Sequence, residues 1–375
     1  MKFTLQKDIL LPKIQFLNSI VPVRNPMPIL TNILLQADEN TGTIQLFATD
    51  LEVSALAEIE CDIEQGGKMA IPAKNIAEII RFLPDEEIHF SSPSAGGCLI
   101  NCLQSKFKLN CADPEDFPIP PERDWRQSFT MNAELFSKMI EKTSFAVSEQ
   151  IGRPAFSGIL WELDDDLQKM VATEGKRLAK YETKLPIKTG KKSIIMPVKG
   201  ANLIRRIINE QDTELRILTE ENSISFDYNG YKIYSRLIEA NYPDYEAVIP
   251  YDNSKTVEIN VQSLTDAIRR VSLLASEDTY RIVLNFSKNQ LEINSEDMEK
   301  GSADEVISLE SSQNIDKFQI GFNYKYLLEI LNLIDTEVVQ IKLENSLDPV
   351  LFYNTEYPED NYNLFLLMPL RLSID

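Results

Sequence analysis

The chain has 375 residues and a formal net charge of −20, because 58 acidic side chains outnumber 38 basic ones. Taken as a whole, this acidity argues against a polyanionic partner, since affinity for nucleic acid comes largely from Lys and Arg side chains that neutralise phosphates. No uninterrupted apolar run approaches the roughly 18 residues of a membrane span, and the segment Met1–Lys7 alternates like a strand instead of resembling a signal peptide. We therefore expect a cytoplasmic protein.

Six segments carry apolar residues at the spacing of amphipathic helices with one buried face. In the third of them Leu135, Met139 and Ile140 recur near helical spacing, and Pro84 ends the second. The predicted helices are Asp8–Val21, Ala73–Leu83, Asn132–Phe145, Lys199–Ile208, Asn260–Leu274 and Tyr324–Ile334.

Between these helices lie alternating runs typical of half-buried strands, such as Thr43–Ala48 and Ser223–Tyr228. Turns are predicted at Asp38–Gly42, Asn229–Gly230 and Ser287–Asn289. The order of strand, helix and several strands occurs twice in each third of the chain. The sequence therefore predicts an α+β fold with antiparallel sheets.

The chain repeats itself three times. Phe117-Pro118, Tyr242-Pro243 and Met368-Pro369 fall 125 and 126 positions apart. Such a period is far longer than the 20 to 50 residues or so of a solenoid repeat, so each copy can bury its own core. The junctions predict three domains, at residues 1–122, 127–250 and 251–375, and the first junction follows a Pro-rich, extended connector.

The predicted helices differ in charge from the rest of the chain. The segments 7–21, 71–83, 132–145, 196–208, 260–274 and 321–334 carry 12 basic and 6 acidic side chains, so their sum is +6 and the remainder is −26. Lys is a common choice for the solvated face of any amphipathic helix. The alternative is a positive face that contacts phosphates without reading base sequence, and a basic excess in three of the four helices of the first two repeats favours it.

The residues needed for catalysis or metal binding are scarce. His89 is the single histidine, no phosphate-binding glycine loop occurs, and the four cysteines contain no Cys-x-x-Cys pair. Because all four, Cys61, Cys98, Cys102 and Cys111, lie in the first repeat, we expect reduced thiols instead of a repeated disulfide framework. Asp164–Asp166 could be a carboxylate metal cluster, but a hairpin tip is the better interpretation. We predict neither catalysis nor a cofactor.

Several stretches resemble the bacterial sliding clamp family, the beta subunit of the replicative DNA polymerase III. The resemblance covers the whole length, and the similar stretches are Met1–Thr4, Pro28–Leu35, Ala48–Glu52, Val171–Ala179, Tyr242–Tyr245 and Met368–Leu372. It implies three copies of the clamp fold, each with two helices and about eight antiparallel strands. It also implies a head-to-tail homodimer that closes into a ring, with sheets outside and helices inside around duplex DNA.

The resemblance also implies three sets of functional residues. Those expected to contact DNA, without sequence preference, are Arg24, Lys74, Arg81, Gln150, Lys199, Arg206 and Arg281. Those expected at the dimer interface are Lys106, Phe107, Lys108 and Leu109 on one side, and Leu273, Leu274, Glu296, Asp297, Glu299, Asp304 and Glu305 on the other. Those expected to form a groove for short linear peptides are Arg153, Phe156, Thr173, Gly175, Lys176, Arg177, Leu178, Pro243, Val248, Leu347, Pro349, Leu366, Met368, Pro369, Leu370, Arg371 and Leu372.

The chain departs from the family pattern at three places. Lys176 stands where many relatives have His, Ala247 replaces an Arg often found beside the groove, and Ser373–Asp375 extends past the usual end. The partners implied by the resemblance are the replicative polymerase, other DNA enzymes and a clamp loader, with no membrane. The alternatives are an acidic three-domain scaffold that binds proteins without surrounding DNA and, more weakly, a carboxylate metallohydrolase.

Overall fold

The structure is a computed structural model that describes residues 1–92, 96–148, 150, 152–185, 190–208, 213–315, 317–357 and 360–372. The tail Ser373–Asp375 therefore lies outside the described residues. The chain divides into two compact units. The first comprises Met1–Ser137 and Lys199–Leu237, and the second comprises Lys138–Val198 and Ile238–Asp375.

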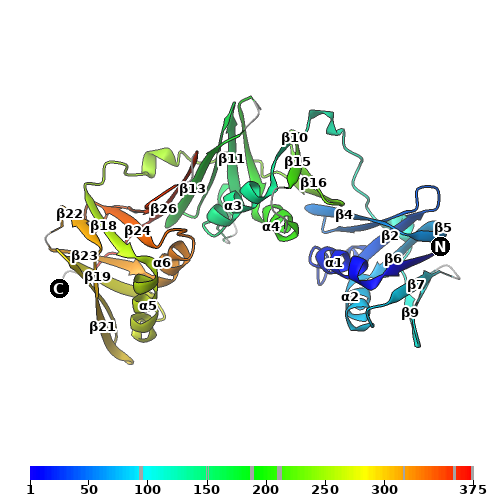
Figure 1. Ribbon diagram of the computed structural model, residues 1–375, viewed down its shortest axis with the longest axis horizontal. Helices are drawn as coiled ribbons and strands as arrows, with labels where there is room; N and C mark the ends of the chain where they lie inside the picture. Colours follow the sequence, from blue (N-terminus) through cyan, green and yellow to red (C-terminus); the bar gives the residue numbers. More distant parts are fainter. Residues whose placement is uncertain are drawn as a thin grey trace. The chain divides into compact units, whose positions relative to one another are not determined.

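All six predicted helices are present in the described part of the chain (Figure 1). They are α1 (Lys7–Asn18), α2 (Ala73–Phe82), α3 (Ala133–Ser144), α4 (Val198–Ile207), α5 (Val261–Val271) and α6 (Tyr324–Leu331). Several end earlier than predicted, because apolar residues continue past the last helical turn. The residues Ser272–Leu274, for example, form a short 3-10 helix after α5. None of the described helices is long and apolar enough to cross a membrane.

The first unit contains two sheets. In order across the larger, the strands are β10 (Phe129–Asn132), β15 (Glu214–Thr219), β16 (Ser223–Tyr228), β17 (Tyr231–Arg236), β4 (Val53–Glu60), β3 (Thr43–Thr49), β2 (Asn32–Asp38) and β6 (Gly67–Pro72). The smaller sheet runs β5 (Asp62–Gln65), β1 (Lys2–Gln6), β7 (Glu87–Ser91), β8 (Gly97–Cys102) and β9 (Ser105–Asn110). Helix α1 packs against α2 and against β3 and β4. The side chains between these layers, such as Leu10, Ile14 and Ile76, are fully buried.

The second unit repeats this plan with different strands. Its larger sheet runs β14 (Lys192–Pro197), β11 (Gly158–Asp164), β12 (Leu167–Thr173), β13 (Arg177–Lys184), β26 (Asn361–Leu367), β25 (Val350–Asn354), β24 (Val338–Leu343), β18 (Lys255–Asn260) and β22 (Ser311–Gln313). Its smaller sheet runs β21 (Gly301–Ser308), β20 (Gln290–Asp297), β19 (Arg281–Ser287) and β23 (Lys317–Asn323). Helix α5 packs against α6, β20 and β21.

The strand pairings are antiparallel, which confirms the predicted class. Predicted turns also lie where expected. Asn229 and Gly230 join β16 to β17 with positive φ angles of 46° and 75°, the geometry that favours Asn-Gly in a two-residue hairpin. Asp165, with φ of 54°, lies at the tip between β11 and β12, so Asp164–Asp166 is the hairpin turn that the sequence favoured.

Candidate functional site

In the second unit, the turn between β12 and β13 brings the predicted groove residues of positions 173–178 together. The Thr173 hydroxyl donates to the Arg177 carbonyl oxygen at 2.7 Å and accepts from the Gly175 amide at 3.1 Å. Gly175 has a φ of 92°, a left-handed conformation that glycine adopts without strain. Thr173 and Gly175 therefore shape the turn, and Lys176 lies at its outer end with an exposed side chain.

Strand β26 lies beside this turn, although it is almost 190 positions further along the chain. The register pairs Arg177 with Leu367 and Leu178 with Leu366, and the Met368 amide then donates to the Lys176 carbonyl oxygen at 2.8 Å. Leu178 and Leu366 are buried in a core cluster with Leu160 and other apolar residues. They form a floor beneath the surface, whereas the side chain of Met368 is 36% exposed.

The segment that follows β26 continues across β23. The Leu370 amide donates to the Gly321 carbonyl oxygen at 2.8 Å. A Cβ atom at Gly321 would lie 2.7 Å from a methyl carbon of Leu372, so the absence of a side chain there allows Leu372 to pack closely. Pro369, Leu370 and Leu372 are consequently half-buried, and Arg371 is exposed.

A second group of predicted groove residues lies on a 3-10 helix, Pro154–Ser157. The Phe156 ring meets the Tyr242 ring edge-on, with centroids 6.2 Å apart, and the Arg153 guanidinium lies 5.9 Å from the Phe156 centroid. Tyr242 itself packs against the core cluster that contains Leu178. This aromatic pair connects Arg153 and Phe156 to the segment that carries Pro243.

The connector 242–255 carries Pro243 and Val248 and is fastened to the larger sheet by side-chain hydrogen bonds. The Tyr245 hydroxyl donates to Glu162 at 2.5 Å, and the Lys180 ammonium donates to Glu246 at 2.7 Å and to the Tyr251 hydroxyl at 3.2 Å. Burial acts to raise the pKa of the Glu246 carboxyl, but hydrogen bonds from Lys180 and Tyr251 outweigh it and lower this pKa. These bonds hold Val248 at the surface, where it is 54% exposed.

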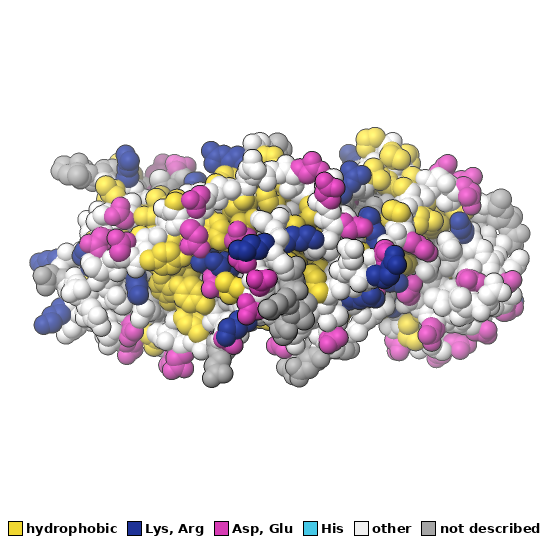
Figure 2. Space-filling view, turned by 90° about the horizontal axis from the view of Figure 1, so that it is seen from above, with side chains coloured by type: hydrophobic (Ala, Val, Ile, Leu, Met, Phe, Trp, Pro, Cys, Tyr) yellow, Lys and Arg dark blue, Asp and Glu magenta, His cyan; other side chains and the backbone are white. Residues whose placement is uncertain are grey.

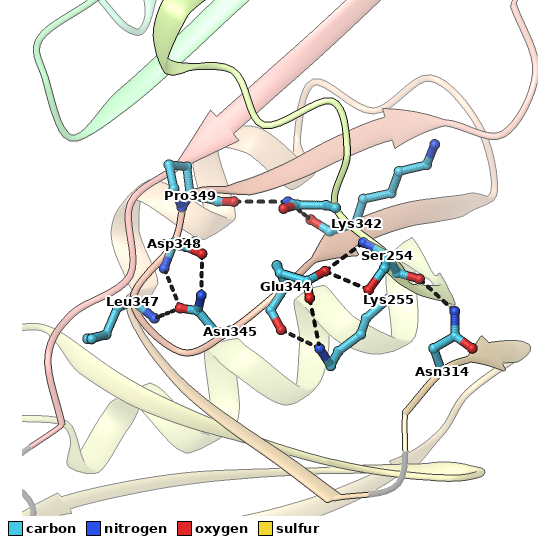
Figure 3. Close-up of polar contacts among 10 residues, drawn as sticks. Ser254, Lys255, Asn314, Lys342, Glu344, Asn345, Leu347, Asp348 and Pro349 are labelled. Atoms are coloured by element: carbon cyan, nitrogen blue, oxygen red, sulfur yellow. Dashed lines mark hydrogen bonds and ion pairs between the residues drawn. The ribbon is translucent and has the colours of Figure 1, made fainter.

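The loop between β24 and β25 carries the remaining predicted groove residues, Leu347 and Pro349 (Figure 3). The Asn345 side-chain oxygen accepts from the amides of Leu347 at 2.9 Å and Asp348 at 3.0 Å, which folds the loop back on itself. Leu347 points away from this hydrogen-bonded turn and is 58% exposed. Exposed hydrophobic side chains also gather in patches on the face drawn in Figure 2, with Lys and Arg side chains among them.

Arg177 differs from the other predicted groove residues, because its side chain reaches toward a helix. The guanidinium lies 4.4 Å from the Tyr326 ring centroid and 5.2 Å from that of Phe145, and it forms an ion pair with Glu329 on α6. Tyr326 was not among the predicted site residues. Its place on α6, three residues before Glu329, is the signal that could have linked both side chains to one basic partner.

The predicted DNA-contacting residues occupy loops, helix faces and one strand end. In the first unit Lys74 and Arg81 are exposed on α2 and border a hollow of about 520 Å³ whose other lining includes Val21–Val23, beside the exposed Arg24. Arg206 is exposed near the end of α4, and Lys199 at its start forms an ion pair with Asp50. In the second unit Gln150 is exposed and Arg281 begins β19.

The structure corrects the charge count of the helices. Lys142 is 4% exposed and forms an ion pair with Asp335 at 2.5 Å, so its charge does not contribute to a positive surface. Lys138 also pairs with Asp335, at 3.2 Å, and Arg270 pairs with Glu305 at 2.5 Å. Counting charges along a sequence cannot separate ammonium groups that face solvent from those neutralised by a neighbouring element.

The predicted interface residues lie at two sheet edges. Strand β9, which carries Lys106–Leu109, is the last strand of the smaller sheet in the first unit, and β21 holds the same position in the second unit. On β9 the side chains alternate, so Lys106 and Lys108 are exposed while Phe107 and Leu109 are half-buried. Asp304 and Glu305 lie on β21, Glu296 and Asp297 end β20, Glu299 lies in the intervening turn, and Leu273 and Leu274 lie in the 3-10 helix after α5.

The carboxylate of Asp297 has a structural partner in the described residues. It accepts from the amides of Glu299 at 2.9 Å and Lys300 at 3.0 Å, and these bonds lower its pKa. Asp297 therefore shapes the turn between β20 and β21, beside the exposed Glu299.

Comparisons with known proteins agree with this architecture. Models of the N-terminal, central and C-terminal domains of the DNA polymerase III beta subunit match residues 1–121, 130–244 and 246–371. The beta sliding clamp of Pseudomonas aeruginosa is 30% identical, over 99% of this chain and 100% of the relative. The crystal structure of the DNA polymerase III subunit beta from that organism has a TM-score of 0.91 at 30% identity, over 99% of this chain and 100% of that one.

A second solved structure shows the same similarity with a ligand bound. It is a sliding clamp from Bartonella birtlesii bound to griselimycin, with a TM-score of 0.93 at 27% identity, and it covers 99% of this chain and 100% of its own. The coverage extends over all three repeats in the sequence. The chain therefore belongs to the DNA polymerase III beta subunit family, the beta sliding clamps.

Proposed function

We propose that this chain is a DNA sliding clamp: a ring-shaped homodimer that encircles duplex DNA and tethers the replicative polymerase and other DNA enzymes to it. The observation that carries this proposal is the full-length similarity to beta sliding clamps, with the three domain models matched in order along the chain. The protein is a non-catalytic processivity factor. Tethering raises the effective concentration of a polymerase at its template and requires no chemistry from the clamp.

The three repeats correspond to domains at residues 1–122, 127–250 and 251–375. Two such chains would provide six domains to one ring, and a clamp loader would open and close it. We place the protein in the cytoplasm, in association with the nucleoid, where its DNA substrate lies.

The dimer would form head to tail, with β9 of one chain beside β21 of the other. Each is an edge strand of its sheet, so the backbone groups on its outer side are available for pairing with another chain. Lys106 and Lys108, which are exposed, would face the acidic set that includes Asp304, and the opposite charges would set the orientation of the two chains. A heterologous contact of this kind closes into a ring when its rotation permits.

The inner surface would carry Arg24, Lys74, Arg81, Gln150, Lys199, Arg206 and Arg281. Contacts of these residues with phosphates would be independent of base sequence. Because a closed ring cannot leave DNA sideways, weak phosphate contacts suffice and allow sliding. The acidic remainder of the surface would discourage DNA from binding outside the ring.

Short peptides of the polymerase and other DNA enzymes would bind the second unit. The exposed apolar side chains of Val248, Leu347 and Met368 are suited to contact apolar anchors of a peptide, and the buried Leu178 and Leu366 would support them from below. Lys176, at the outer end of the β12–β13 turn, would contribute a positive charge at the edge. This arrangement predicts that peptide binding depends on Met368.

Retention on DNA tests the proposed function. The protein should stay on nicked circular DNA and slide off the same DNA after linearisation, whereas equal dissociation from both would contradict a ring.

Reversing both charges with Lys106→Glu and Lys108→Glu should weaken the dimer, measured by analytical ultracentrifugation, and should abolish retention on circles. An unchanged dimer would reject β9 as the interface. Met368→Ala should weaken binding of a short linear peptide of the polymerase without changing retention.

A further inference from the structure

The connector 242–255 links two sides of the proposed groove in the second unit. It carries Pro243 and Val248, and its last residues, Asn253–Lys255, contact the loop that carries Leu347 and Pro349. One stretch of chain therefore both supplies one side of the groove and fastens the other.

Asn253 makes the central contact. Its side chain is 9% exposed, and its amide nitrogen donates to the carbonyl oxygens of Lys342 and Pro349, both at 3.1 Å. Lys342 lies on β24 and Pro349 immediately precedes β25, so these bonds join the two ends of the loop (Figure 3). A backbone carbonyl can only accept, so no rotation of either partner could replace the Asn253 donor.

Ser254 and Lys255 add to this attachment at the first residue of the loop. The Ser254 amide and hydroxyl donate to the Glu344 carboxylate at 2.8 Å and 2.6 Å, and the Lys255 ammonium donates to the Glu344 carbonyl oxygen. These bonds, together with an ion pair of 3.6 Å between Lys255 and Glu344, hold the β24 end of the loop. Asn253 is the residue that also holds the β25 end.

We propose that Asn253 is a positioning residue for peptide binding: it keeps the loop 344–349 in the one conformation that places Leu347 and Pro349 against an incoming peptide. The inference rests on the proposed function of the groove. If the loop samples other conformations when Asn253 is lost, the apparent affinity falls in proportion to the fraction of chains that remain competent. Asn253 acts through the loop and does not touch the peptide.

The test is Asn253→Asp, which replaces the donor by an acceptor of the same shape, in the full-length dimer. Asn32→Asp is a matched control in the first unit, because buried Asn32 also donates from its side chain to two backbone carbonyls, those of Pro28 and Ile29, at 3.2 Å and 3.1 Å. Griselimycin, bound in the similar Bartonella birtlesii structure, is the probe for titration calorimetry. Loss of two hydrogen bonds predicts an affinity reduced on the order of tenfold for Asn253→Asp, and less than about twofold for Asn32→Asp.

Hydrogen exchange provides a second readout that does not depend on the probe. The amides of Leu347 and Asp348 should exchange faster in Asn253→Asp and at the wild-type rate in Asn32→Asp. If Asn253→Asp does not fold, Asn253→Ala, which adds no repulsive oxygen, takes its place. Equal affinity and equal exchange in the Asn253 variant and the wild type would overturn the positioning role. Failure of the wild type itself to bind griselimycin would count against the proposed groove, and the exchange rates would still decide whether Asn253 orders the loop.

Discussion

The two units contain the same turn at the same place in their larger sheets, and the turns differ in the residues that surround them. In the first unit the Thr49 hydroxyl donates to the Val53 carbonyl oxygen at 3.1 Å and accepts from the Leu51 amide at 3.0 Å. Thr173, Arg177 and Gly175 make the corresponding bonds in the second unit. Because the first unit has this backbone geometry as well, the geometry belongs to the repeat and does not depend on the peptide binding proposed for the second unit.

The strand beside each turn ends in the same way but with a different side chain. The Arg236 amide donates to the Glu52 carbonyl oxygen at 3.1 Å in the first unit, where the second unit has the Met368 amide and the Lys176 carbonyl. Arg236 is exposed and charged, whereas Met368 is exposed and apolar. An ordinary junction between repeats therefore becomes a candidate binding surface through its side chains, with little change in the backbone.

The largest effect is expected when the second junction is given the side chain of the first. Met368→Arg should weaken griselimycin binding by about 100-fold, near 3 kcal/mol, because an apolar anchor is lost and a charge must be desolvated. Since Met368 is partly exposed, the free energy of unfolding should change by less than about 1 kcal/mol. Calorimetry and urea unfolding measure the two quantities. Unaltered binding would show that Met368 does not line the site.

The first helices of the first two repeats, α1 and α3, also differ at one equivalent position. Helices α1 and α3 are both 12 residues long, and each of the four buried positions of α1 is also buried in α3, so Phe16 and Lys142 occupy equivalent places. Phe16 meets the Tyr231 ring edge-on, with centroids 5.1 Å apart, whereas Lys142 pairs with Asp335.

Asp335→Asn should destabilise the protein by about 2 kcal/mol, because it leaves the buried Lys142 ammonium without its counter-charge. Lys142→Met should lower the free energy of unfolding by less than about 1 kcal/mol. The Asp335 carboxylate is 45% exposed, so it remains hydrated, and it keeps its ion pair with Lys138. Urea unfolding that ranks the two variants in the opposite order would contradict this assignment.

The same pair predicts how stability depends on pH. Burial alone would raise the pKa of the Asp335 carboxyl, but the hydrogen bond and charge of Lys142 outweigh it and lower this pKa. The ion pair therefore contributes stability above the unfolded pKa of about 4, and this contribution is lost as the pH falls through the lower folded value. Asp335→Asn should show a shallower loss of stability in acid than the wild type does, measured by urea unfolding between about pH 5 and pH 3.

The repeat, the six helices and the turns could be predicted from the sequence alone, because each depends on local periodicity or on turn residues such as Asn229 and Gly230. It could not supply the pairing of β13 with β26, which brings Arg177 beside Leu367 across a long sequence separation. Charge along the helices was equally insufficient, since the burial of Lys142 depends on Asp335 in another repeat. The contacts of Asn253 with Lys342 and Pro349 likewise join residues about 90 positions apart, so Asn253 carried no local signal. For Tyr326 the local signal was only its spacing of three residues from Glu329 on α6.

The conformation of the turns themselves provides the next test. Gly175→Leu places a leucine in the second turn where the first turn has Leu51. The backbone at Gly175 has a φ of 92°. No atom lies within 4 Å of a Cβ placed at Gly175, so the cost arises from the left-handed backbone and not from a collision. The variant should lose about 1 kcal/mol of stability. A loss above about 3 kcal/mol, measured by urea unfolding, would indicate a clash that the geometry excludes.

The reverse exchange, Leu51→Gly, should have the smallest effect and the opposite sign. Leu51 has a φ of 77°, which disfavours a residue with a Cβ atom, and its side chain is 44% exposed, so little packing is lost on its removal. Relief of about 1 to 2 kcal/mol of backbone strain is partly offset by the greater entropy that glycine has in the unfolded chain, near 1 kcal/mol. The expected net gain is about 0.5 kcal/mol, which should appear as a slightly higher urea midpoint with an unchanged slope. A destabilised Leu51→Gly variant would mean that the exposed leucine makes a contact of its own, and the first turn would then be a candidate binding surface in the assembled protein.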